Sequence, residues 1–158
     1  MSTSPLPSLI DALVKAATDL LPEAHVSDSY STENPDKLVQ LAVGVDDPDR
    51  VSQTQSGIAD SDWATTGFRL DLSQTGSLLC HLHSEQGTTD AREVREAVYA
   101  AYDVLRELIR TRSHNGVTID VPGSWKLWVS QERLYQSQYE AGASADLMFT
   151  VSFETIRL

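Results

Sequence analysis

The 158-residue sequence contains a single cysteine, Cys80, which excludes an internal disulfide and a cysteine-based zinc cluster. Basic residues are also scarce, since 12 Lys and Arg stand against 23 Asp and Glu and leave a net charge of −11. Phosphate binding needs a concentrated basic surface, so this balance argues against a protein that wraps nucleic acid. No apolar run approaches the roughly 20 residues of a membrane span. The first residues lack the basic start of a signal peptide, so we expect neither membrane insertion nor secretion.

What the sequence does contain is typical of a globular protein, with 41% hydrophobic and 22% charged residues. Its length suits one domain over residues 1–158. Acidic residues are concentrated in residues 1–88, which carry 13 acids and four bases. Residues 46–66 are the least regular part, with five acids and only two bulky apolar side chains, Ile58 and Trp63. We therefore predict a long acidic loop there, which is either functional or ordered by a partner.

Two segments have the apolar spacing of helices. In the first, apolar residues recur from position 9 to position 21, and Pro22 marks the end. Its start is capped by Ser8, or by Ser4 with Pro5 at the first helical position. In the second, Asp90 and Glu93 resemble a capping box before an apolar stripe that runs to position 109. The pair Asn115-Gly116 is the expected stop of this second helix.

Period-two alternation predicts strands in the remainder of the chain. In residues 38–45, the side chains of Val39, Leu41, Val43 and Val45 are expected on one side. A turn at Gln74-Thr75-Gly76 is expected to join two strands into a hairpin, and a small-residue turn is expected at 140–145. The alternating segments are 38–45, 68–72, 78–82, 117–121, 125–139 and 147–153. The predicted fold class is therefore α+β, an antiparallel or mixed sheet with two main helices packed on one face.

Few residues suggest catalysis or metal binding. His81 and His83 lie two apart on a predicted strand, so both rings could reach one metal, but no third ligand is evident. Two solvent-facing histidines are the preferred interpretation. The acids after position 45 lack the central glycine and final glutamate of an EF-hand, and Cys80 alternates with apolar residues and is assigned to the core. The sequence also lacks a nucleophile elbow, a Walker loop and a dinucleotide fingerprint, so we expect no catalytic residue, no metal, no cofactor and no enzymatic activity.

The tryptophans suggest a protein interface instead. By alternation Trp125 faces the core, whereas Trp128 lies on the polar side beside Lys126. Interfaces favour exposed tryptophan, although a tryptophan covered by the long loop or by a helix is an equal alternative. The long loop and the chain ends are further expected contact regions. The candidate interface residues are Trp128, Trp63, Tyr139, Arg157 and Leu158.

Several segments in order resemble a known family. A capped N-terminal helix leads to Val-Gly-Val-Asp at 43–46 and the acidic loop, and Gly-Thr-Thr-Asp-Ala-Arg at 87–92 opens the second helix. The closing strand contains Leu-Met-Phe-Thr-Val at 147–151. This pattern resembles the tail terminator, or tail-completion, proteins of long-tailed bacteriophages over nearly the whole chain.

The resemblance implies a structural virion protein that forms a hexameric ring. Such a ring caps the tail tube, ends its polymerisation and joins it to the head-side connector or stopper protein. It implies a place in the tail or neck of the virion, after assembly in the host cytoplasm, and a lumen that DNA traverses without specific binding. An acidic wall would repel the genome, so the candidate lumen residues are Asp46, Asp47, Asp49, Asp60 and Asp62.

Three alternatives remain open at this stage. Another phage neck or head-completion connector protein would share the small size, the acidity and the ring assembly. A small enzyme or ligand-binding domain would instead show a concave pocket with convergent polar groups. A monomeric regulatory module is the third alternative.

Overall fold

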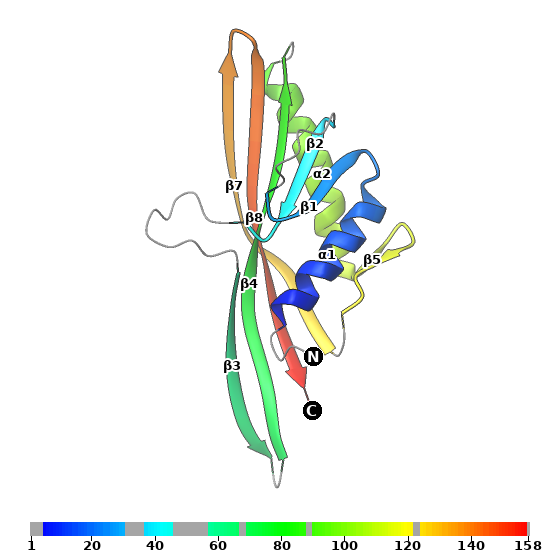
Figure 1. The fold of residues 1–158 in the computed structure, drawn as a ribbon, viewed down its shortest axis with the longest axis vertical. Helices are drawn as coiled ribbons and strands as arrows, with labels where there is room; N and C mark the ends of the chain where they lie inside the picture. Colours follow the sequence, from blue (N-terminus) through cyan, green and yellow to red (C-terminus); the bar gives the residue numbers. More distant parts are fainter. Residues whose placement is uncertain are drawn as a thin grey trace.

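The computed structural model of the chain describes residues 5–30, 37–45, 57–66, 69–87, 90–121 and 124–157. Two helices pack against a mixed six-stranded sheet, which confirms the predicted α+β class (Figure 1). The helices are α1 (Leu6–Leu20) and α2 (Ala91–Thr111). The sheet contains β1 (Ala24–Asp28), β2 (Val39–Val43), β3 (Gly57–Thr66), β4 (Arg69–Gln86), β7 (Ser124–Tyr139) and β8 (Gly142–Arg157), and a separate ribbon contains β5 (Ser113–His114) and β6 (Val117–Thr118).

The sheet is built around the long central strands β4 and β8. The strand order is β1-β2-β4-β8-β7, with β1 and β2 parallel and the other pairs antiparallel. One edge of β4 is shared by two strands, because β3 pairs with its first half and β2 with its second half. As a result the β3–β4 hairpin extends along the long axis of the molecule, away from the part of the sheet that contains β1 and β2 (Figure 1).

The core lies between the helices and one face of the sheet. Both helices are on the same side of the sheet (Figure 1), and alternate residues of β4 and β8 point toward them, as the period-two pattern predicts. The ring of Tyr102 on α2 meets that of Phe149 on β8 edge-on, with the ring centroids 5.4 Å apart. The opposite face, which we call the open face, carries mostly polar side chains. Core residues include Leu9, Leu13, Leu78, Cys80, Leu82, Val94, Val98, Leu105, Leu147, Phe149, Val151 and Phe153.

The two helix starts differ in how well the sequence predicts them. Asp90 caps α2 as predicted, because its carboxylate accepts a hydrogen bond from the Glu93 backbone N–H at 3.1 Å. The predicted Ser8 cap of α1 is wrong, since the helix begins at Leu6 and Ser8 lies within its first turn. Pro5 occupies the capping position instead of the first helical position, and Ser4 lies outside the described residues.

The end of α2 also differs from the prediction. The helix ends at Thr111, where Arg112 adopts the left-handed conformation with φ of 65° and its backbone N–H bonds the Leu108 carbonyl. Asn115-Gly116 is not the helix stop but the turn between β5 and β6, and both residues have positive φ. The predicted strand at 117–121 is reduced to the two residues of β6, while Ile119 and Val121 remain buried.

The predicted hairpin around Gln74-Thr75-Gly76 is wrong. These three residues lie within β4, which runs without a break for 18 residues. Gln74 is buried and its side-chain amide donates to the Ser61 hydroxyl of β3 at 3.2 Å, so its polarity is satisfied inside the sheet. The predicted acidic loop is wrong over residues 57–66, which form β3 and pair with β4. Residues 46–56 lie outside the described part of the structure.

Three smaller differences concern the strands and their ends. The sequence analysis does not predict β1 at all. Gly44, with φ of 75°, interrupts the alternation of β2, so Val45 joins a small buried cluster with Ala42, Leu79 and Met148 on the open face. The turn between β7 and β8 is only Glu140-Ala141, and Gly142 follows with φ of 147°.

Neither described helix is long and apolar enough to cross a membrane.

Candidate functional site

The open face brings polar residues of four strands into register. Pairing places His83 of β4 opposite Gln40 of β2 on one side and Asp146 of β8 on the other. Asp146 in turn lies opposite Tyr135 of β7. His81 is two residues away on the same face of β4, as its alternation with Leu82 predicts. The sheet therefore holds two imidazoles and a carboxylate on adjacent strands.

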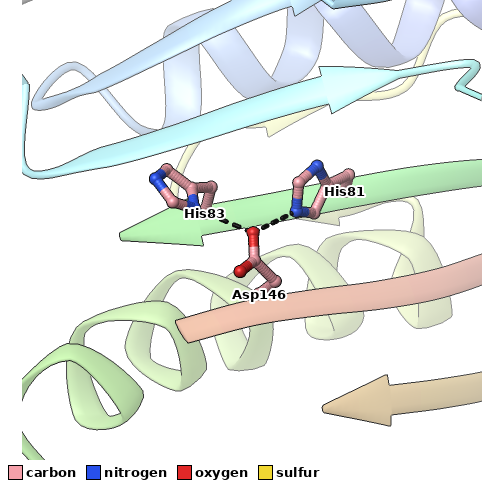
Figure 2. A group of neighbouring side chains, drawn as sticks. All are labelled: His81, His83 and Asp146. Atoms are coloured by element: carbon pink, nitrogen blue, oxygen red, sulfur yellow. Dashed lines mark hydrogen bonds and ion pairs between the residues drawn. The ribbon is translucent and has the colours of Figure 1, made fainter. Parts of the chain in front are cut away.

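The three side chains converge on one atom, as Figure 2 shows. Asp146 Oδ1 lies 2.7 Å from His81 Nε2 and 2.8 Å from His83 Nδ1. The side chains are 15%, 27% and 32% exposed for His81, His83 and Asp146, so the group is half-buried. We call these residues the His–Asp–His cluster. Both histidines lie on the outer sheet face, as predicted, but they are largely buried and not solvent-facing. A third possible ligand, which the sequence did not reveal, comes from Asp146 on a distant strand.

The electrostatics of the cluster favour an ionised carboxylate. Burial alone would raise the pKa of Asp146, but the hydrogen bonds from His81 and His83 outweigh it and hold the pKa well below its ordinary value. The hydrogen bond to Asp146 raises the pKa of His83 against the opposing effect of burial, and the nearby Glu85 carboxylate adds to the rise. An ionised carboxylate only accepts hydrogen bonds, so both facing ring nitrogens donate to it.

A hollow of about 300 Å³ opens in front of the cluster. β1 and β2 form its far wall, where His25 has a buried Nε2 without a hydrogen-bond partner among the described residues. The Tyr30 ring meets the His81 ring edge-on at a centroid distance of 5.5 Å. Three of the four histidines of the chain therefore surround one hollow.

The hollow lacks a cysteine nucleophile. Cys80 is adjacent in sequence to His81 but points into the core, as predicted, and burial raises its pKa to about 12. A thiol with that pKa stays protonated at neutral pH and is a poor nucleophile. What the cluster offers is a set of two imidazole nitrogens and one carboxylate oxygen, which is suited to holding a cation or a proton.

Exposed aromatic side chains mark a second part of the open face, along β7. Trp128 is 44% exposed and Tyr135 and Tyr139 are each 40% exposed, and these are three of the five large hydrophobic side chains described as exposed. Trp128 faces away from the helices, as predicted, whereas Trp125 packs against the core. Tyr139 donates a hydrogen bond to Glu85 of β4. We call Trp128, Tyr135 and Tyr139 the β7 aromatic strip.

The other predicted interface residues are less fully placed. Trp63 belongs to β3 and Arg157 to the end of β8, but their side chains lie outside the described part of the structure. Leu158 is outside the described residues altogether. The sequence did not single out Tyr135, because alternation from Trp128 would place it on the inner side of the strand. The register shift between Val129 and Gln131 reverses the alternation and turns Tyr135 to the open face.

The candidate lumen acids do not form one irregular loop. Asp60 is exposed on β3, in line across the sheet with Glu154 of β8 and Lys126 of β7. Asp62 lies two residues further along β3, and its side chain is outside the described part. Asp46, Asp47 and Asp49 also lie outside the described residues. Placement of these acids on irregular chain is thus wrong for the two that belong to a strand.

Comparisons with known proteins show a likeness of fold. No family model matches this chain, and no curated protein does. Among solved structures, it is similar to a chain in the virion of a native gene transfer agent particle, with a TM-score of 0.51 and 11% sequence identity. The similarity covers 97% of this chain and 99% of that chain. The fold described above is therefore also the fold of a virion component, from its first described helix to its last strand.

Proposed function

We propose that this chain is a structural protein of a phage-like virion, and that it forms a ring which closes the tail tube. The finer role is that of a tail terminator, which stops tube polymerisation and joins the tube to a head-side connector or stopper protein. In this proposal the protein acts in the tail or neck, is assembled in the host cytoplasm and has no enzymatic activity. The fold likeness to a gene transfer agent virion component supports the virion setting.

The observation that carries the proposal is the exposed edge of β7. This strand is 16 residues long and, among the described residues, pairs only with β8. Its outer row of backbone groups is a template for pairing with another chain, and soluble monomers avoid long edges of this kind. The β7 aromatic strip runs along the same strand. A long edge that no other described strand pairs with, beside exposed Trp and Tyr side chains, is what a subunit interface requires.

The second edge of the sheet supports closure into a ring. On that side β1 and the β3–β4 hairpin are the outer elements among the described strands. A contact between β7 of one protomer and the opposite edge of the next joins two different surfaces. Such a head-to-tail contact, repeated by rotation, closes a ring and leaves no free edge.

The first experiment measures the mass of the assembly. Size-exclusion chromatography with light scattering on the purified chain should give a species of about six times the 17.4 kDa protomer mass. Electron microscopy of the same sample should show rings, and labelled antibody should bind at the tail or neck of the particle. A monomer at all concentrations would overturn ring formation. A ring located at the head vertex would favour the alternative, a head-completion connector.

The acidic lumen is tested by charge reversal. Lysine at the five candidate positions should leave folding intact and create DNA binding that weakens steeply with salt. The matched control reverses five acids that are exposed on other elements. Equal DNA affinity in the two variants would contradict a lumen position. The test positions are Asp46, Asp47, Asp49, Asp60 and Asp62, and the control positions are Asp11, Asp19, Asp28, Asp103 and Asp120.

A further inference from the structure

We propose that His81, His83 and Asp146 form a binding site for a divalent transition-metal ion, with Zn²⁺ as the ion whose ligand preferences fit best. The inference does not depend on the proposed role in a virion. It revises the expectation of a metal-free protein, which rested on the lack of a third ligand next to the two histidines.

The donor set and its spacing fit such an ion. One ring nitrogen from each histidine and one carboxylate oxygen lie within 4.8 Å of one another. Zinc takes imidazole nitrogen at about 2.0–2.1 Å and carboxylate oxygen at about 2.0–2.2 Å, so ligand atoms of a tetrahedral site are about 3.3 Å apart. The present Oδ1 separations of 2.7 and 2.8 Å are shorter. A small rotation of the half-buried Asp146 side chain therefore opens the space that the ion needs.

The backbone already holds the ligands in place. His81 and His83 point to one side of β4 because they lie two residues apart, and pairing sets Asp146 directly opposite His83. Both strands are central in the sheet, and β4 and β8 pair over 15 residue positions from Leu72 to Gln86. The conformational entropy of the ligand side chains is therefore lost largely during folding, and little more is lost when the ion binds.

The protons of the cluster can be accounted for. In the metal-free protein, His81 Nε2–H and His83 Nδ1–H both point at Asp146 Oδ1. Binding of the ion frees these two nitrogens: a neutral ring moves its single hydrogen to the other nitrogen, and a protonated ring releases one proton to solvent and keeps the hydrogen on the other nitrogen. For His83 that nitrogen is Nε2, which lies 3.6 Å from Glu85 Oε2. A carboxylate behind a metal-bound histidine is the arrangement that orients the ring and raises its basicity.

The hollow in front of the cluster provides the remaining coordination position. Three protein ligands leave a tetrahedral ion one open site, which water or an external donor fills. The hollow of about 300 Å³ is large enough for such a ligand, and the polar residues His25 and Gln40 are among those that line it. His25 in the wall of the hollow has a buried Nε2 without a hydrogen-bond partner among the described residues, and a turn of its ring would bring this nitrogen to a metal-bound water or donor group.

The test is titration of tag-free, full-length protein with Zn²⁺ and with Co²⁺ as a spectroscopic probe. We expect one equivalent of tightly bound Zn²⁺, a visible Co²⁺ absorption band typical of a low-coordinate site, and a higher melting temperature with Zn²⁺. His81→Gln, His83→Gln and Asp146→Asn should each lose at least about tenfold in affinity, and Glu85→Gln should lose a smaller factor. The matched control is His114→Gln, on the separate β5–β6 ribbon, which should bind as the wild type does.

Circular dichroism and cooperative unfolding of each metal-free variant show that it is folded. Asp146→Asn keeps the size of the side chain, so it remains informative if a histidine variant does not fold. The proposal is overturned if the wild type binds no Zn²⁺ beyond what the Asp146→Asn variant binds. It is also overturned if His114→Gln weakens binding as much as the cluster variants do, since binding would then be nonspecific.

Discussion

Replacing Trp128 with alanine should weaken assembly while leaving the protomer folded. The side chain is 44% exposed in the isolated chain. A tryptophan has roughly 250 Å² of surface to bury, so about 110 Å² remains for a partner to cover. At about 25 cal/mol per Å² this surface is worth at most about 2.7 kcal/mol. An interface that leaves part of the ring wet gives about 2 kcal/mol, which corresponds to roughly a 30-fold loss in association constant.

Analytical ultracentrifugation over a range of protein concentrations measures this loss directly. Arg106→Ala is the control, because Arg106 is exposed on α2 and belongs to neither edge of the sheet. Chemical denaturation of the Trp128→Ala protomer should differ from the wild type by less than about 1 kcal/mol, since an exposed side chain contributes little to folding. Assembly with the wild-type constant would refute the interface role. A large loss of protomer stability would show that Trp128 supports the fold itself.

Three further predictions concern the fold. Asp90→Ala removes the cap of α2 and should lower the free energy of unfolding by about 1 kcal/mol. Gly142→Ala should cost about 1–3 kcal/mol, because φ is 147° and a Cβ would fall on the Gln86 carbonyl oxygen and 2.7 Å from the Gly87 Cα. The Cys80 thiol, with its pKa raised to about 12, should react with a disulfide reagent at pH 8 only as fast as the chain unfolds.

Denaturant unfolding monitored by circular dichroism checks the two substitutions, and absorbance of the released thiolate follows the cysteine. Asp90→Asn is the control for the cap and should retain most of the stability. For the turn, Gly116→Ala is the comparison, because a Cβ there meets nothing within 4 Å and only the positive φ opposes it. Equal costs at Gly142 and Gly116 would contradict the steric argument. Thiol modification faster than unfolding would contradict the buried position of Cys80.

The parts of the fold that the sequence predicts are those set by neighbouring residues. The capping box of Asp90 and Glu93 acts across three residues, and the alternation around Phe149 needs only the pleat of one strand. By contrast, Gln74 and Gly76 have the composition of a turn, yet they lie within β4. Gly76 is directly opposite Phe153 of β8, so pairing with a distant strand overrides the local preference.

The sequence-based prediction of the candidate site was incomplete because it also depends on pairing with a distant strand. That His81 and His83 share a face follows from their spacing alone. Asp146 lies between the predicted turn at 140–145 and the predicted strand from 147, and its contact with both histidines depends on the register between β4 and β8. A single sequence carries little information on the register of strands separated by a whole helix. β1 was missed because Ala24–Asp28 has few apolar residues and owes its conformation to parallel pairing with β2.

The position of β8 in the strand order has a consequence for synthesis on the ribosome. β8 is translated after every other described strand, yet it lies between β4 and β7 in the sheet and is the only described partner of β7. Until β8 emerges, the nascent chain has a hairpin of β3 and β4 and the helix α2. The apolar stripe of α2 then still lacks the β8 residues against which it packs in the folded protein. The last step of folding is therefore the insertion of β8 between the unpaired edges of β4 and β7. Chaperone binding to α2 and β7 during this interval would protect the surfaces that are most prone to aggregate.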